Sequence, residues 1–492
     1  MPLRNIRRFV VLGLLLALPI PLRAATVDAT AARGIAVAFL ESLGAPQVEI
    51  VRGPEVAGDP RALAFVFVLE PAGYVVVAAD DALPPVIAYS IESQYPSDAG
   101  TDNPLIDLLT ADLRSRLAAL PMLDAREAEA RRVAWTELAG GTSRRDERFE
   151  QWPPEGSTPT GGWILTNWTQ SAPYNALCPL DLAHGGARSV AGCPAVAMAM
   201  ILNYHATIQE TAFGTGDRYW HNYAGNAYWI PDASAQYGFP NFPTLNGYLQ
   251  TLTQHWDAGT PLTNTDKAAL VFGCGVAARQ VYSASGSGTF GVNQAFTAYQ
   301  RFAFTDCRLV FDTDPNLYPD LAEQMQNALP AHLAVVDPGW TMGHNVVVDG
   351  YNSDDYFHLN FGWGGSYNGW YLLPQEIPYG LTVIEGVILD IMPTSSAVTE
   401  NRILGSSFEL TGQPNPFCPR VTLSFTAPAA GRARLGIYDA TGRLQALVLN
   451  EEIHAGPRSL VWTPERLATG VYWARLRLGG RVVETRRLVL AK

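Results

Sequence analysis

The pattern of apolar and polar positions predicts different secondary structure in successive parts of the chain. Near the N-terminus, the spacing predicts a helix over residues 31–43, and the apolar run 73–79 predicts a strand. A second helix is expected over residues 104–120. Together these elements predict a small α+β unit over residues 26–140.

The C-terminal part shows a different pattern. Short alternating runs at 421–425, 433–438 and 471–478 are separated by turn residues, which predicts a β-sandwich over residues 404–492. Residues 394–492 carry 13 Lys and Arg and 7 Asp and Glu, so their net charge is +6, against −18 for the remainder. This charge difference indicates a boundary near residue 394 and a linker over 394–403.

Two segments lie between these units. Residues 139–161 are rich in Gly, Arg, Glu and Pro, which predicts an exposed activation linker over 141–161 and a natural site of proteolytic cleavage. Residues 162–393 contain most of the Trp and Tyr and all of the candidate chemistry. We therefore expect the functional domain there.

The first 25 residues have the features of a signal peptide. They combine a basic start, an apolar stretch from Phe9 to Leu18 and a small-residue exit at Ala24-Ala25. No later stretch is apolar over the length that spans a membrane. We expect a protein that is secreted or held at the cell surface.

Composition narrows the classes of function. The chain has 492 residues, of which 48% are hydrophobic and 16% charged, as expected of several globular domains. A net charge of −12 argues against nucleic acid as a partner. The histidines are scattered and no H-E-x-x-H occurs, so no metal and no cofactor is expected.

Five cysteines leave at least one unpaired in an oxidising compartment, unless it bonds another chain. Spacing leaves a Cys274–Cys307 bridge open. Cys193 follows Gly192 and precedes Pro194 and a run of helix-forming residues, so it is expected at a helix N-terminus, where free amides stabilise a thiolate. It is a candidate nucleophile, and without a basic partner it would be read as a buried structural cysteine.

His344 is the candidate base. It follows Gly343 at the start of an apolar strand, 151 positions after Cys193, close to the separation in papain-type enzymes. A strand-end histidine bonded to backbone is the alternative. Asn360, in an F-x-L-N-F-G-W-G-G stretch, is placed to accept the imidazole N–H, and Trp363 to shield that contact from water. Alone, this motif would be a structural hairpin.

Gln170 is the candidate oxyanion-hole residue. It lies upstream of the cysteine in N-W-T-Q-S-A-P-Y-N, and its side-chain amide with the backbone N–H of Cys193 would hold the oxyanion formed by thiolate attack on a carbonyl. Taken singly, it reads as an ordinary solvated loop glutamine. His358 alternates with its strand neighbours and is expected to be structural.

These motifs, in this order, resemble the streptopain family of secreted bacterial papain-like cysteine peptidases, which are made as zymogens. The resemblance covers most of residues 26–393 and implies a two-lobed peptidase domain over 162–393, preceded by an inhibitory pro-domain over 26–140. It implies protein or peptide substrates and the pro-domain as intramolecular inhibitor. Pro194 and Phe361 depart from the family pattern, and neither replaces a reacting group.

The resemblance also suggests residues that contact substrate. They lie in a Ser- and Gly-rich loop and beside the histidine: Ser285, Gly286, Ser287 and Gly343. From composition alone, the loop is only a flexible linker. A non-peptidase amidase or acyl transferase on the same fold, or a catalytically idle surface-binding protein, remain alternatives.

The C-terminal segment contains N-P-F at 415–417, Y-D-A-T-G-R at 438–443 and G-V-Y at 470–472. With these residues it resembles the immunoglobulin-like tails of exported bacterial enzymes, which are related to flagellar-hook-capping and secretion-sorting domains. The resemblance implies contact with the cell surface or the secretion machinery. A passive stabilising appendage is the alternative.

Overall fold

The computed structural model describes most of the chain after the predicted signal peptide. The described residues are 26–45, 48–58, 60–95, 104–123, 125–140, 149–336, 343–373, 384–393, 410–414, 417–427, 431–438, 444–454, 456–464, 467, 469–478 and 481–491. The predicted signal peptide, residues 141–148 of the activation linker and the linker 394–403 lie outside them.

The N-terminal unit contains the predicted helices and strand. Its helices are α1 (Ala29–Ser42), α2 (Pro104–Ala119), the 3₁₀ helix η1 (Leu120–Met122) and α3 (Ala125–Ala139), and its strands are β1 (Glu49–Val56), β2 (Ala64–Glu70), β3 (Tyr74–Ala78) and β4 (Val86–Ser90). Asp28 caps α1 by accepting hydrogen bonds from the backbone N–H groups of Thr30 and Ala31. The predictions for α1, α2 and β3 are confirmed, whereas α3 was not predicted.

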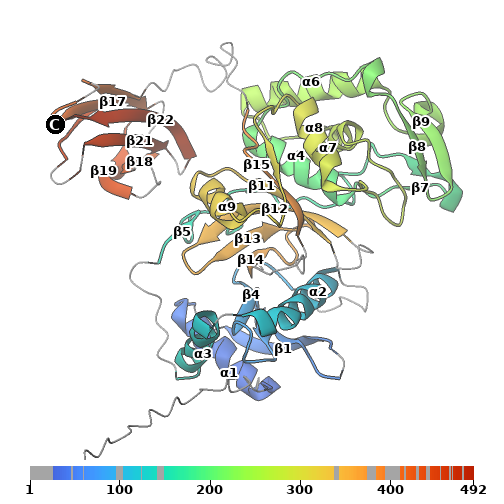
Figure 1. Cartoon of the computed structure of the whole chain (residues 1–492). Helices are drawn as coiled ribbons and strands as arrows, with labels where there is room; N and C mark the ends of the chain where they lie inside the picture. The colour runs from blue at the N-terminus through green and yellow to red at the C-terminus, as the bar shows by residue number, and fades with distance from the viewer. Residues whose placement is uncertain are drawn as a thin grey trace, which may run out of the picture.

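The middle of the chain combines a helical lobe with a sheet. Its helices are η2 (Leu182–His184), α4 (Cys193–His205), η3 (Thr215–Asp217), α5 (Ser234–Tyr237), α6 (Phe242–Ala258), α7 (Asn264–Ala277), α8 (Val292–Arg301) and α9 (Leu317–Gln326). Its strands are β5 (Gln151–Trp152), β6 (Leu180–Asp181), β7 (Ala187–Arg188), β8 (Tyr219–Tyr223), β9 (Asn226–Ile230), β10 (Arg308–Val310), β11 (Ala331–Val336), β12 (Gly343–Asn352), β13 (Tyr356–Asn360), β14 (Gly369–Leu372) and β15 (Ile384–Leu389). Figure 1 shows α4, α6, α7 and α8 gathered beside the strands. The predicted α+β class is confirmed.

One antiparallel sheet runs through both of these units. Its strand order is β1-β2-β3-β4-β14-β13-β12-β11-β15-β10, with β5 paired to β12. The junction is the pairing of β4 with β14, where Tyr89 opposes Trp370 and Ala88 opposes Tyr371. The N-terminal unit therefore extends the sheet of the middle domain (Figure 1).

The two faces of this sheet bury different cores. Ala334 of β11 and Val347 of β12 belong to the core that includes α4, α7 and α8. Their neighbours Val335 and Val346 belong to the core on the other face, which includes residues of α2 and α9. This alternation is the ordinary two-residue period of a strand, and it decides which side chains of β12 can meet α4.

Two residues of the predicted activation linker pair with the sheet, whereas residues 154–157 that follow are exposed. Gln151 and Trp152 pair with Asn352 and Tyr351 of β12, and the rings of Trp152 and Tyr351 stack with centroids 6.1 Å apart. Aromatic packing of this kind anchors the linker to β12 at Trp152.

The C-terminal segment is the predicted β-sandwich. One sheet contains β16 (Thr411–Gln413), β17 (Val421–Ala427) and β20 (Gly456–Trp462), and the other contains β18 (Gly431–Tyr438), β19 (Leu444–Ile453), β21 (Gly470–Leu478) and β22 (Arg481–Leu490). Inward-facing residues such as Leu423, Leu435 and Leu476 form its core. The strands predicted from alternation are confirmed. Apolar and polar residues alternate along them because one face of each strand is buried.

All five cysteines are free thiols in the structure, so Cys274 and Cys307 are not bridged. Among the described residues, no helix combines the length and apolar character needed to cross a membrane. In the same part of the chain, no cluster of three or more His, Cys, Asp or Glu side chains is arranged to bind a metal.

Candidate active site

Cys193 is the first residue of α4, as the sequence predicts. The turn before it needs glycine, because Gly192 has φ +85° and a Cβ there would lie 2.5 Å from the side-chain oxygen of Gln280. Pro194 occupies the first turn of the helix, where its missing N–H removes no hydrogen bond. The thiol therefore lies at the end of the helix that carries free backbone N–H groups.

Two distant segments hold the candidate nucleophile turn, residues 190–192. The backbone N–H of Ala191 donates to the carbonyl of Gln170 at 2.9 Å, and the N–H of Val190 donates to the carbonyl of Ser283 at 3.1 Å. The buried Gln280 side chain also donates to the carbonyl of Ala191 at 2.7 Å. The predicted oxyanion residue and the predicted substrate loop are thus both next to the nucleophile turn.

The Ser- and Gly-rich loop is an ordered turn rather than a flexible linker. The hydroxyl of Ser283 donates to the carbonyl of Gly286 at 2.8 Å and lies 3.1 Å from the hydroxyl of Ser285. Ser287 closes the turn, since its hydroxyl accepts from the N–H of Ser283 at 3.1 Å. Internal hydrogen bonds fix the loop beside Cys193.

His344 lies near the start of β12 and is 6% exposed. Its Nε2 donates to the carbonyl of Phe361 at 2.8 Å. Trp363 stacks on the imidazole, with ring centroids 4.3 Å apart and an interplanar angle of 26°. Gly343, beside it, is exposed at the end of the strand.

Asn360 makes contacts other than the expected one in this structure. Its Oδ1 accepts from the N–H of Gly362 and its Nδ2 donates to the carbonyl of Thr166, both at 3.1 Å. The imidazole N–H is bonded to the Phe361 carbonyl instead. Asn360 is therefore satisfied by the backbone on either side of it.

The sulfur and the imidazole lie on opposite faces of β12. Asn345 faces α4, because its Nδ2 donates to Sγ of Cys193 at 3.9 Å. His344, one residue earlier, faces the other way and packs with Phe361 and Trp363. The thiol and the imidazole are brought to the same strand end but are not paired.

Burial keeps both groups neutral in this arrangement. It raises the pKa of the Cys193 thiol to about 11, although hydrogen bonds from Asn345 oppose the shift. Burial also lowers the pKa of His344 to about 4. At neutral pH the site holds a thiol and a neutral imidazole, which is an inactive state for thiolate chemistry.

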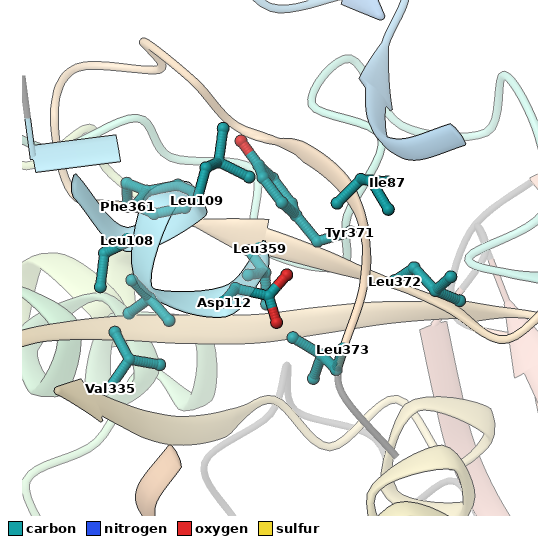
Figure 2. A pocket seen from close by; sticks show the side chains of 11 residues that line it. Ile87, Leu108, Leu109, Asp112, Val335, Leu359, Phe361, Tyr371, Leu372 and Leu373 are labelled. Carbon is teal, nitrogen blue, oxygen red and sulfur yellow. The ribbon is translucent and has the colours of Figure 1, made fainter. Parts of the chain in front are cut away.

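The N-terminal unit covers the face on which His344 lies. Helix α2 packs there over an apolar pocket whose walls include Leu108 and Leu109 of the helix, Val335 and Val346 of the sheet, and Phe361 (Figure 2). Val335 is the residue that opposes His344 in the β11–β12 pairing. The same unit thus packs against the surroundings of the histidine.

A buried ion pair fastens α2 at this place. The Arg116 Nε donates to the Asp112 carboxylate at 2.8 Å, and Arg116 also bonds the carbonyl of Leu372 in β14. Figure 2 shows Asp112 among the apolar residues of the pocket. Burial raises the pKa of Asp112, and the Arg116 charge opposes that shift.

Sequence reasoning missed three residues that contact Cys193, its turn or a neighbour of it, namely Gln280, His332 and Asn345. Each is a single polar residue inside or beside an apolar run, which gives no pattern that points to Cys193. The buried histidine His358 was predicted to be structural, and in the structure its Nδ1 lies 2.6 Å from the Asp349 carboxylate.

The N-terminal unit and the middle domain each match a known protein family. Residues 168–371 match the model of the Peptidase C10 family, and residues 24–114 match that of the Spi protease inhibitor. The chain is 27% identical over 357 residues to the thiol protease/hemagglutinin PrtT of Porphyromonas gingivalis. That match covers 68% of this chain and spans 38% of the length of PrtT.

Two solved structures of Prevotella intermedia proteins are also similar. A prointerpain A fragment is 20% identical with a TM-score of 0.44, covering 70% of this chain and 99% of the fragment. Active interpain A, described as a cysteine protease, is 22% identical with a TM-score of 0.35, covering 47% and 94%. From the two family matches, the chain contains a segment of the Peptidase C10 (streptopain-like) type over residues 168–371, preceded by a segment of the Spi protease inhibitor type over residues 24–114.

Proposed function

We propose that the protein is a secreted cysteine endopeptidase made as a zymogen, in which Cys193 and His344 form the catalytic dyad after the pro-domain is removed. The observation that carries this proposal is the position of Cys193. It starts α4 beside Gln170 and the Ser283–Ser287 turn, and the residue that touches its sulfur is the chain neighbour of His344. The proposed dyad requires the start of β12 to rearrange so that the imidazole reaches the sulfur.

The reaction follows from these groups. The Cys193 thiolate attacks the carbonyl carbon of the peptide, and the Gln170 amide with the Cys193 N–H holds the oxyanion. The protonated His344 gives its proton to the leaving amine, which breaks the peptide bond. Water, deprotonated by His344, then attacks the acyl-enzyme and releases the acid and the thiolate. Asn360 and Trp363 would orient and shield the imidazole in this state.

The pro-domain would maintain latency through the geometry described above. It extends the sheet at β14 and covers the His344 face with α2, so the imidazole stays between Trp363 and the Phe361 carbonyl. Its removal would free β12 to rearrange. Substrate contacts would come from Ser285, Gly286, Ser287 and Gly343.

Export and the role of the β-sandwich complete the proposal. The N-terminal 25 residues would direct secretion, and the C-terminal module would make contact with the cell surface or the secretion machinery. The net charge of residues 394–492 is positive, whereas that of the rest of the chain is negative. This difference supports a separate role for the module.

Proteolysis by the processed protein tests the proposed function. After removal of the pro-domain, we expect casein to be cleaved, and the epoxide inhibitor E-64 to stop the cleavage by alkylating one thiol. Peptide mapping should locate the inhibitor on Cys193. Failure to cleave casein or denatured protein, together with hydrolysis of small amides, would favour an amidase instead. Absence of any E-64 adduct at Cys193 would remove the thiolate from the mechanism.

A further inference from the structure

A chain of hydrogen bonds between polar groups runs from the interior of the helical lobe to the nucleophile. The hydroxyl of Tyr299 on α8 lies 3.1 Å from Nδ1 of His332 on β11. The Nε2 of His332 lies 2.7 Å from Oδ1 of Asn345, whose Nδ2 donates to the Cys193 sulfur at 3.9 Å. Tyr299 and His332 are both fully buried.

The direction of each hydrogen bond can be assigned along this chain. Burial raises the pKa of Tyr299 well above its usual range, so its hydroxyl keeps its proton and can donate to His332. Burial lowers the pKa of His332 to about 4, so the ring is neutral. With Nδ1 accepting, Nε2 carries the hydrogen and donates to Oδ1 of Asn345, which turns the Asn345 amide N–H toward the sulfur.

We propose that Asn345 is a positioning residue that holds the Cys193 sulfur as a hydrogen-bond acceptor, and that His332 and Tyr299 fix the orientation of its amide. This inference rests on the proposed role of Cys193 as nucleophile. Amide donors favour a thiolate over a thiol, and the side chain and backbone of Asn345 both lower the pKa of Cys193 against its burial. The network therefore favours ionisation of the sulfur while the imidazole is still on the other face of β12.

The experiment measures alkylation of Cys193 by iodoacetamide in the full chain between pH 7 and 9, with peptide mapping to read that thiol alone. Asn345→Leu keeps the shape and removes the amide. It should raise the thiol pKa by about one to two units, because hydrogen bonds to charged groups are stronger than neutral ones. The net alkylation rate should fall about three- to tenfold, since the remaining thiolate is more nucleophilic.

Two tyrosine variants complete the design. Tyr299→Phe removes only the hydroxyl at the far end of the hydrogen-bond network. It should also slow alkylation of Cys193, by a smaller factor than Asn345→Leu. Tyr282→Phe is the matched control, because Tyr282 is also buried but makes no hydrogen bond to this network among the described residues. If Asn345→Leu does not fold, the comparison of the two tyrosine variants still decides the matter.

Wild-type alkylation rates in both Asn345→Leu and Tyr299→Phe would overturn the inference, as would equal slowing in Tyr282→Phe and Tyr299→Phe. This result is independent of the proposed peptidase activity, because it reads ionisation of the thiol and not turnover. If Cys193 is required for proteolysis but its alkylation is unchanged in these variants, only the role of Asn345 fails. If Cys193 is dispensable for proteolysis, the proposed function fails instead.

Discussion

Replacing Cys193 with alanine is expected to abolish peptide hydrolysis by the processed protein. In the proposed mechanism the sulfur forms the acyl-enzyme, and loss of a catalytic nucleophile typically costs on the order of 10⁵-fold or more in kcat. The free energy of unfolding should change little, because the Cys193 side chain is partly exposed and its backbone hydrogen bonds remain. Initial rates on a fluorogenic peptide, with thermal melting as the folding check, measure both effects.

The matched control is Cys418→Ala, which removes an exposed free thiol of the β-sandwich. This variant should keep the wild-type rate, since Cys418 lies outside the domain that carries the site. A processed Cys193→Ala protein that cleaves the peptide at the wild-type rate would show that another group performs the attack.

Removing the pro-domain is expected to accelerate alkylation of Cys193 at pH 7 by about 100-fold. With a pKa of about 11, only about one thiol in 10⁴ is ionised in the structure described here. Pairing with an imidazolium brings cysteine pKa values to about 3.5–7.5, which ionises most of the thiol. The ionised fraction therefore rises by about four orders of magnitude. The weaker nucleophilicity of a low-pKa thiolate lowers the resulting gain in alkylation rate by roughly two of these orders.

The comparison of full and processed chains by an iodoacetamide pulse makes this measurement. A processed His344→Ala protein serves as control and should return toward the slow rate, because the gain comes from the imidazole. Equal rates in the full and processed wild-type chains would mean that the pro-domain does not keep the thiol and imidazole apart.

Local patterns predicted the parts of the fold that local chemistry determines. Gly192, Cys193 and Pro194 predict a helix start, and α4 begins there, because glycine provides the left-handed turn and proline suits the first helical turn. The strands of the β-sandwich followed from alternation, since one face of each is buried. The bounds of α1 and α2 also followed from helical spacing.

Long-range pairing could not be predicted in this way. No local signal joins β4 of the pro-domain to β14, because the partners are far apart in sequence and are selected by packing of Tyr89 against Trp370. Likewise, the face on which His344 lies depends on the register of β12 and on the Phe361 carbonyl. Asn345 was missed because one asparagine in an apolar strand does not reveal which neighbour it will contact.

The pairing of Cys193 with His344 is tested most directly by a crystal structure of the processed, active protein. We expect Sγ and an imidazole nitrogen within about 4 Å, with the hydrogen bond from His344 to the Phe361 carbonyl broken. A fully active processed protein in which His344 still donates to Phe361, on the face of β12 away from the sulfur, would contradict the proposed dyad.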